Sequence, residues 1–118
     1  MRHSDYTCNI GCPTEAALEV IGGKWKGVIL YHLSSGTKRF NELQRLMPVS
    51  QRMLTTQLRG LENDQIVHHQ VYPEVPPRVE YSITEFGCTL EPILKVLQAW
   101  GEMYLKQLAE IRRESATP

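Results

Sequence analysis

Hydrophobic residues in the first third of the chain recur with the spacing of short amphipathic helices. Residues 14–23 read as a helix that begins behind Pro13 and is stopped by Gly22 and Gly23. Residues 24–36 predict a second helix that ends at Gly36. Its apolar positions follow a three- and four-residue spacing and mark one buried face: Trp25, Val28, Ile29, His32 and Leu33.

Two more amphipathic helices follow with a very short connection. Residues 39–48 place Phe40, Leu43 and Met47 on one face, and Pro48 ends that helix. Ser50 is a suitable N-cap for the next helix, residues 50–64, whose inward positions are Leu54, Leu58 and Leu61. Two amphipathic helices joined by only three residues must cross steeply, which predicts a helix-turn-helix.

The hydrophobic period then changes from helical to twofold. Residues 66–72 and 78–83 alternate in the manner of half-buried strands. The intervening PEVPP, residues 73–77, is rich in proline and predicts a protruding loop instead of a tight turn. A strand pair after a helix-turn-helix is a wing, so residues 67–83 are assigned to one.

We expect Thr84 to cap the last helix, whose apolar stripe is longer than a small domain needs for its own core. Pro92 predicts a kink or restart near Leu90. The predicted fold is therefore mainly α with a small β-wing, a winged helix-turn-helix with a long C-terminal helix. We expect residues 1–11 to be a flexible arm, residues 12–111 to form the domain, and residues 112–118 to be a frayed tail.

Length and composition agree with one globular domain. The chain has 118 residues, of which 42% are hydrophobic and 22% are charged. It contains no apolar run of the roughly 20 residues that span a bilayer, and its N-terminus lacks the apolar core of a signal peptide. These features predict a cytoplasmic protein with no membrane association. Three cysteines, an odd number, favour free thiols there over a disulfide framework.

The net charge of zero hides an uneven distribution. Between Lys24 and Gly60 the chain has seven cations and one anion, Glu42, a surplus of six positive charges. Affinity for phosphate depends on the local field and not on the total charge. This block therefore favours nucleic acid as a partner.

The outward face of residues 50–64 has the side chains that read base edges in the major groove. Arginine pairs with guanine, glutamine pairs with adenine, and threonine offers a hydroxyl and a methyl group. In a helix-turn-helix the N-terminal part of the second helix reaches the bases. The residues in that part are Gln51, Arg52, Thr55 and Thr56.

Other polar residues are placed to contact the DNA backbone. Arg59 lies one turn further along the reading helix, and Lys38, Arg39 and Ser50 flank the helix pair. Arg78, at the loop edge of the second wing strand, is placed for a minor groove or a phosphate. The alternative is an ordinary solvated face. The short turn, the wing and the segregated charge together favour the DNA-binding interpretation.

Residues 12–108 also resemble a known family through several motifs taken together: GGKW, RFNEL, SQRMLTTQLRGLE, YSITEFG and LQAWG. The chain is similar to the HxlR-type winged helix-turn-helix regulators of bacteria and archaea. This resemblance implies a transcriptional regulator that forms a homodimer through its N- and C-terminal helices and binds a palindromic operator. Some members look like sensors of electrophiles or oxidants that use a cysteine before the first helix, and Cys12 stands at that position.

The cysteine and histidine residues allow several interpretations. Cys12 near a helix N-terminus has a setting that can lower a thiol pKa, which suits a redox-sensing residue, although an inert thiol fits as well. Cys8 and Cys12 lack the two-residue gap of thioredoxin-like motifs, and Cys88 is expected to be a packing residue. His68 and His69 are adjacent and point to opposite faces of a strand, which disfavours a shared metal ion.

No motif for catalysis or for a cofactor is found. GGKW fails the P-loop pattern, since Leu18 replaces a glycine and Trp25 replaces the serine or threonine. We expect no enzyme activity, cofactor or metal. Trp25 and Trp100 suit a core or an interface, or else the wall of a small-molecule pocket. A winged-helix protein–protein adaptor without specific DNA binding is the alternative function.

Overall fold

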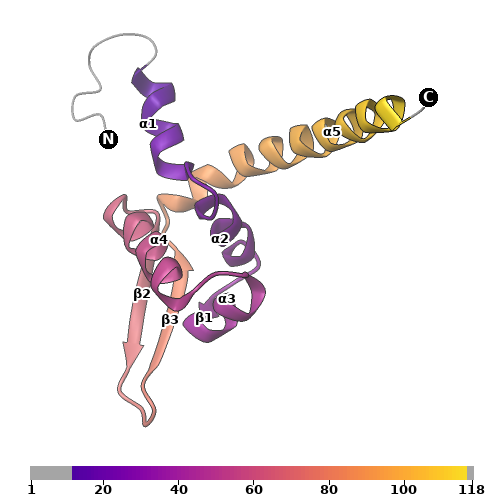
Figure 1. The fold of residues 1–118 in the computed structure, drawn as a ribbon. Helices are drawn as coiled ribbons and strands as arrows, with labels where there is room; N and C mark the ends of the chain where they lie inside the picture. Colours follow the sequence, from indigo (N-terminus) through magenta and orange to yellow (C-terminus); the bar gives the residue numbers. More distant parts are fainter. Residues whose placement is uncertain (1–11, 117–118) are drawn as a thin grey trace. The chain divides into compact units, whose positions relative to one another are not determined.

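The computed structural model describes residues 12–116 and confirms a mainly helical chain with a small sheet (Figure 1). Contacts divide the chain into one unit up to Cys88 and a second from Thr89 onward, and each is described by itself. The elements in chain order are α1 (Cys12–Ile21), α2 (Lys26–Leu33), β1 (Lys38–Arg39), α3 (Phe40–Leu46), α4 (Gln51–Asn63), β2 (Val67–Tyr72), β3 (Arg78–Ile83), the 3-10 turn η1 (Gly87–Leu90) and α5 (Glu91–Ala116).

A turn separates the first two helices, and α2 begins two residues later than predicted. Gly23 has a φ of 81°, a left-handed conformation that glycine adopts without a steric penalty, and α2 begins only at Lys26. Its fully buried residues are Ile29, Leu30 and Leu33. Leu30 was absent from the predicted face, whereas the predicted Trp25, Val28 and His32 are only half-buried.

Helices α3 and α4 form the predicted helix-turn-helix, joined by residues 47–50. Leu43 and Met47 from the first helix and its turn are buried, as are the inward leucines of α4. Each buried leucine contributes roughly 1.5–3 kcal/mol through the apolar area it removes from water. Ser50 is the N-cap, since its Oγ accepts a hydrogen bond of 3.1 Å from the backbone N–H of Met53.

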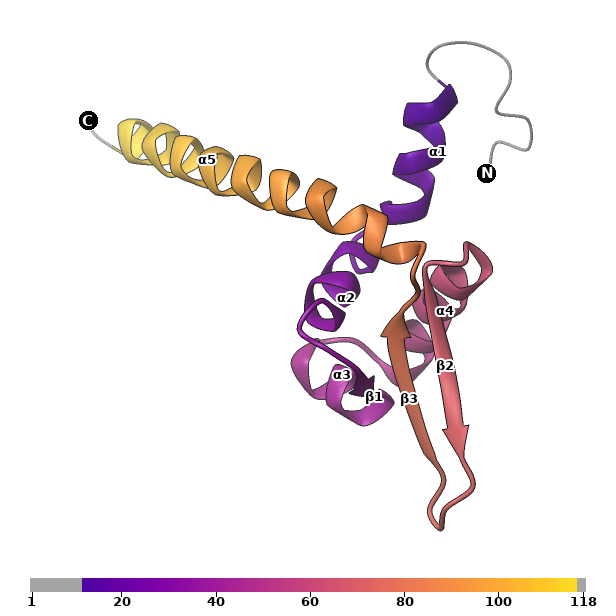
Figure 2. The same ribbon diagram turned by 180° about the vertical axis from the view of Figure 1, so that it is seen from behind.

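The sheet has three antiparallel strands in the order β1-β3-β2 (Figure 2). Strands β2 and β3 are the predicted wing pair, with Val67 opposite Ile83 and Tyr72 opposite Arg78. Strand β1 pairs Lys38 with Tyr81 and was not predicted. Two residues are too few to show a period, so only the pairing identifies this strand.

The exit from the wing is held closely to the end of α4. The Thr84 hydroxyl donates to the Gln65 carbonyl at 2.6 Å, and the Gly87 N–H donates to Thr84 Oγ1 at 2.8 Å. A Cβ at position 87 would collide with the Ile66 carbonyl oxygen, so this close approach requires glycine. These contacts fix the end of the sheet opposite the wing loop against the segment that follows α4.

The second unit consists largely of α5, which begins directly after η1 and confirms the predicted restart near Leu90. The helix continues to Ala116, past the position where the frayed tail was expected to start. It contains no buried residue. Among residues 12–116 no helix has the length and apolar character needed to cross a bilayer.

Candidate nucleic-acid interface

Helix α4 separates its two faces as the sequence predicted. Leu54, Leu58 and Leu61 are between 0% and 1% exposed, so they anchor the helix in the core. On the opposite side Gln51 and Arg52 are exposed, as are Thr56 and Arg59, and Thr55 is half-buried. The helix can therefore present polar side chains outward without weakening its packing.

The two threonines of this face use their hydroxyl protons within the helix. Thr55 Oγ1 donates to the Gln51 carbonyl at 2.8 Å, and Thr56 Oγ1 donates to the Arg52 carbonyl at 3.0 Å. Their oxygens keep lone pairs, so toward a ligand they present an acceptor and a methyl group. Such a pair suits an amino group of adenine or cytosine, or the thymine methyl group.

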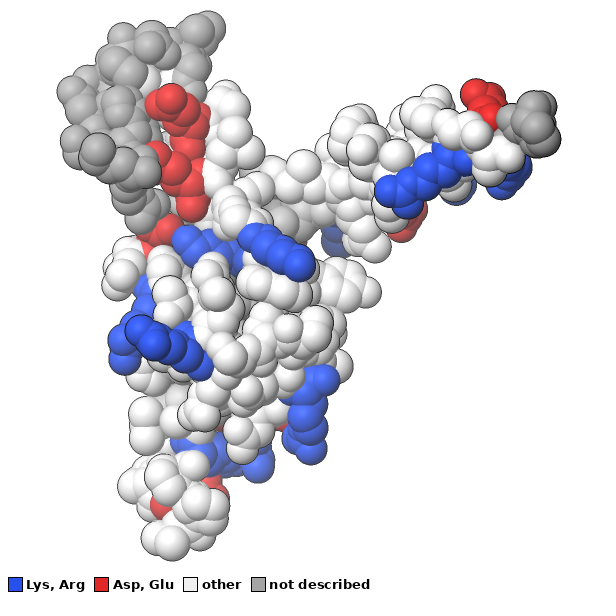
Figure 3. All heavy atoms as spheres, in the orientation of Figure 1, with Lys and Arg blue, Asp and Glu red and all other residues white. Residues whose placement is uncertain are grey.

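The cations of α4 have no carboxylate partner in the described part of the chain. Neither Arg52 nor Arg59 makes an ion pair there. Figure 3 shows Lys and Arg side chains over the region of α2, α3 and α4, with the Asp and Glu side chains of this view gathered mainly on α1. Two unpaired guanidinium groups on one helix favour an anionic partner.

Lys38 and Arg39 lie on β1, immediately before α3. The Lys38 Nζ donates to Ser35 Oγ at 3.1 Å, and the Arg39 backbone N–H donates to Glu42 Oε1 at 2.9 Å. Glu42 therefore satisfies an otherwise free donor at the start of α3. The only anion of the basic block is thus committed to the backbone of its own helix.

The wing presents its cation differently. Arg78 Nε lies 2.9 Å from Glu74 Oε2, and Arg78 Nη1 lies 3.4 Å from Glu80 Oε2. The Nε–H is not aligned for a hydrogen bond, so the first contact is an ion pair only. The guanidinium also stacks over the Tyr72 ring at 4.0 Å. Two carboxylates and one aromatic face therefore surround a single guanidinium.

Folding brings together the base of the wing, α3 and α4 at Tyr81. Its ring centroid lies 6.3 Å from that of Phe40 and 5.7 Å from that of His69. His69 Nδ1 is 2.7 Å from Glu62 Oε1, which connects β2 to the C-terminal part of α4. Burial raises the pKa of Tyr81, the Glu62 carboxylate raises it further, and Arg59 acts in the opposite direction.

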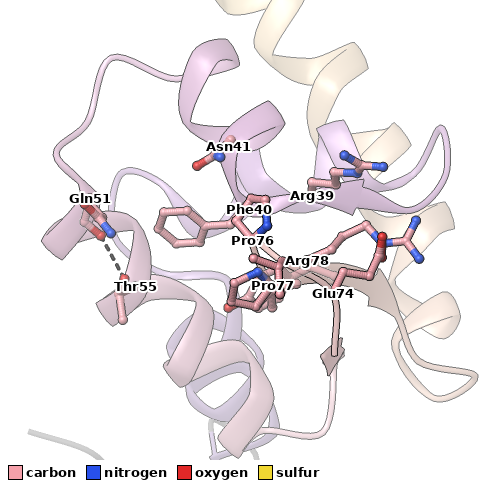
Figure 4. A pocket seen from close by; sticks show the side chains of 12 residues that line it. Arg39, Phe40, Asn41, Gln51, Thr55, Glu74, Pro76, Pro77 and Arg78 are labelled. Carbon is pink, nitrogen blue, oxygen red and sulfur yellow. Dashed lines mark hydrogen bonds and ion pairs between the residues drawn. The ribbon is translucent and has the colours of Figure 1, made fainter. Parts of the chain in front are cut away.

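A cavity of about 500 Å³ lies between the helix-turn-helix and the wing (Figure 4). Gln51 and Thr55 line it from α4, and Arg39 and Arg78 belong to its lining as well. Lys38, Ser50, Arg52, Thr56 and Arg59 do not line it. The other lining residues were not among the predicted site residues; they are Phe40, Asn41, Glu74, Val75, Pro76, Pro77, Val79 and Tyr81.

Figure 4 shows how the labelled side chains divide around this cavity. Gln51 and Thr55 lie on one side, and Pro76 and Pro77 of the wing loop lie across from them. The guanidinium of Arg78 points away from α4 and lies beside Glu74. The cavity therefore has amide and hydroxyl groups on its helix side and proline rings on its wing side.

The cysteines differ from the expected free thiols at one position. Cys12 is disulfide-bonded and 1% exposed, whereas Cys88 is free and exposed. Cys8, and with it the predicted arm of residues 1–11, lies outside the described residues. Within residues 12–116 no three His, Cys, Asp or Glu side chains gather in a way that could hold a metal ion.

A family model described as "HxlR-like helix-turn-helix" matches residues 20–109. The chain belongs to the HxlR-like helix-turn-helix family. It is 56% identical over 102 residues to the uncharacterized HTH-type transcriptional regulator YdeP of Bacillus subtilis, and the match covers 86% of this chain and 80% of YdeP. The chain is accordingly a transcriptional regulator of the helix-turn-helix type.

Solved structures of similar regulators support the same fold. The redox regulator HypR in its reduced form is 57% identical, with a TM-score of 0.79 over 83% of this chain and 98% of HypR. The reduced form of the regulator YodB of B. subtilis is 39% identical, with a TM-score of 0.69 over 78% of this chain and 91% of YodB. Sequence and structure therefore agree on a winged helix-turn-helix regulator.

Proposed function

We propose that this regulator binds double-stranded DNA in a sequence-specific manner, with α4 in the major groove. Gln51, Arg52, Thr55 and Thr56 read base edges, and Arg59 contacts a phosphate. Lys38, Arg39 and Ser50 contact the backbone beside the helix pair, and Arg78 contacts it from the wing. The observation that carries this proposal is the separation of buried leucines from outward-facing polar side chains on α4.

We further propose that two copies act together as a homodimer on a palindromic operator. Helix α5 supports this arrangement because several large apolar side chains on it are about half exposed or more, among them Ile93, Leu97, Trp100 and Tyr104. The Trp100 and Tyr104 rings stack at 5.6 Å and present a continuous apolar surface. In such a dimer the two α4 helices must lie about 34–36 Å apart to enter successive major grooves.

The DNA-binding proposal is tested by measuring affinity for fluorescent duplexes as a function of salt. Fragments bound by the protein are first selected from sheared genomic DNA of the source organism, and their common sequence provides the operator duplex. We expect affinity to fall steeply as salt rises, because each neutralised phosphate releases counterions. Salt-insensitive binding to a protein, with no operator recovered, would instead identify an adaptor.

Cys12 is proposed as the residue through which an oxidant or electrophile changes operator binding. Support comes from the disulfide at this position and from the similarity to HypR, whose structures are described as reduced and oxidized forms. A change of thiol state at Cys12, the first residue of α1, alters the packing of α1 against α2, and so can rotate one protomer against the other.

The Cys12 proposal is tested by comparing the wild type with Cys12→Ser. Operator affinity is measured after reduction with dithiothreitol and after treatment with diamide or a quinone. We expect the wild type to bind differently in the two states and Cys12→Ser to bind equally in both. A Cys12→Ser variant that still responds like the wild type would remove Cys12 from the mechanism.

A further inference from the structure

The wing cation Arg78 is held by three groups of its own chain. Glu74 of the wing loop and Glu80 of β3 are within ion-pair distance, and Tyr72, its cross-strand partner, lies under the guanidinium. The side chain of Arg78 is only 30% exposed. A DNA phosphate that binds Arg78 must therefore compete for a guanidinium that is already occupied.

The two carboxylates are not equally placed to give way. Glu80 lies within β3, is paired in register with Arg39 of β1, and its side chain is 23% exposed. Glu74 lies in the loop beyond the end of β2, and its side chain is 53% exposed. Its ion pair with Arg78 is close to the surface, where solvent screening makes such pairs weak. Displacing Glu74 from Arg78 therefore costs only a small amount of free energy.

Glu74 also places a negative charge where the duplex would approach. Glu74 and Glu80 together carry two negative charges beside Arg78, which carries one positive charge. A phosphate near Arg78 is thus attracted by Arg78 and by Arg39, which is paired with Glu80 in the sheet, and is repelled by the two carboxylates. Helix α4 has no equivalent, since neither Arg52 nor Arg59 has a carboxylate partner in the described residues.

From these contacts we infer that Glu74 limits the affinity of the regulator for DNA by competing with phosphate for Arg78. This inference rests on the proposed DNA-binding function and identifies Glu74 as a residue that weakens DNA binding. Arg78 in the wing must exchange the Glu74 carboxylate for a DNA phosphate before it adds to the affinity for DNA. Its contribution is consequently small in the wild type and larger once the Glu74 charge is removed.

The test uses a 40-base-pair duplex of random sequence, since a phosphate contact does not depend on bases. Affinity is measured by fluorescence anisotropy for the wild type, Glu74→Gln, Arg78→Ala and the double variant. We expect Glu74→Gln to bind about three- to fivefold more tightly. We also expect its plot of log affinity against log salt to be steeper by about 0.9, the increment for one additional phosphate contact.

The matched control is Glu85→Gln, which changes the net charge equally. Glu85 follows the other end of β3, roughly 20 Å from Arg78 along the strand. We expect it to leave affinity and salt dependence close to those of the wild type. Circular dichroism and thermal melting of each variant show whether the fold is retained, and Glu80→Gln provides a second neutralised carboxylate beside Arg78.

Three results would overturn the inference. Unchanged or weaker binding by folded Glu74→Gln would show that the carboxylate does not compete with DNA. An equal gain from Glu74→Gln with and without Arg78 would show repulsion alone, without competition for the guanidinium. If the wild type shows no salt-dependent binding to any duplex, the proposed function fails as well, so the two failures are distinguishable.

Discussion

Helix α4 and the wing both carry arginine toward the proposed DNA, but in opposite electrostatic settings. On α4, Arg52 and Arg59 are exposed and make no ion pair within residues 12–116. In the wing, Arg78 has two carboxylates and an aromatic ring around it. The guanidinium groups of α4 are therefore directly available for a phosphate or a base, whereas Arg78 must first exchange a carboxylate for the phosphate.

This difference also limits what can be inferred from charge counted along the chain. The basic block between Lys24 and Gly60 has one anion, Glu42, in sequence. In the folded chain, Arg39 of this block lies opposite Glu80 in the sheet. The surplus of positive charge around β1 is consequently smaller than the sequence suggested, whereas the surplus on α4 remains.

The largest effect is expected from a change in the anchoring of α4. Leu58→Ala removes a side chain that is 1% exposed and should lower the free energy of unfolding by about 2–5 kcal/mol. Val71→Ala is the matched control in the wing, because Val71 is 55% exposed and should change stability by less than about 0.5 kcal/mol. Urea unfolding measures both. Similar losses at both positions would contradict the contrast between an anchored helix and an exposed wing.

An intermediate effect is expected when the two arginines are compared directly. Arg52→Ala should weaken operator binding by about 1–3 kcal/mol and relax base preference at one position of each half-site. Arg78→Ala should weaken binding less and leave base preference intact, since its guanidinium is already engaged by Glu74 and Glu80. Affinity for the operator and for single-base variants of it separates the two. Loss of base preference in Arg78→Ala, or unchanged base preference in Arg52→Ala, would contradict the roles given to the two arginines.

The smallest effect concerns Tyr81, which joins the two regions. Its pKa is raised above 10.0, mainly by burial, so the unfolded phenol ionises at lower pH than the folded one. The stability that depends on the neutral phenol is present below pH 10.0 and is lost as pH rises through the folded pKa. Tyr81→Phe should therefore flatten the decline of stability between about pH 9 and about pH 11. Urea unfolding across this range checks the slope; an identical slope in both proteins would exclude Tyr81 as its source.

Much of the fold follows from local sequence. The leucine spacing of α4, the Ser50 cap and the restart near Leu90 each depend on residues within a few positions of one another. The same locality explains why the outward face of α4 was predicted correctly. A helix determines which side chains share a face from their spacing alone.

Two features that depend on contacts between distant parts of the sequence were not predicted. Strand β1 exists only because Lys38 and Arg39 pair with β3, and Tyr81 is central only because Phe40 and His69 are brought to it. The engagement of Arg78 by Glu74 had a local signal, an acid four residues before a base. That signal was missed because the pair spans the wing loop and not a helix.

Cross-linking is the sharpest test of whether the outward face of α4 meets the duplex. A photo-reactive p-benzoylphenylalanine replaces Arg52 in one variant and Asn63, exposed at the end of α4, in another. Both are irradiated with the operator duplex. We expect the probe at position 52 to cross-link to bases of the operator and the probe at position 63 not to cross-link to DNA. Cross-links to DNA from position 63 alone, or from position 52 only to another protein, would contradict this expectation.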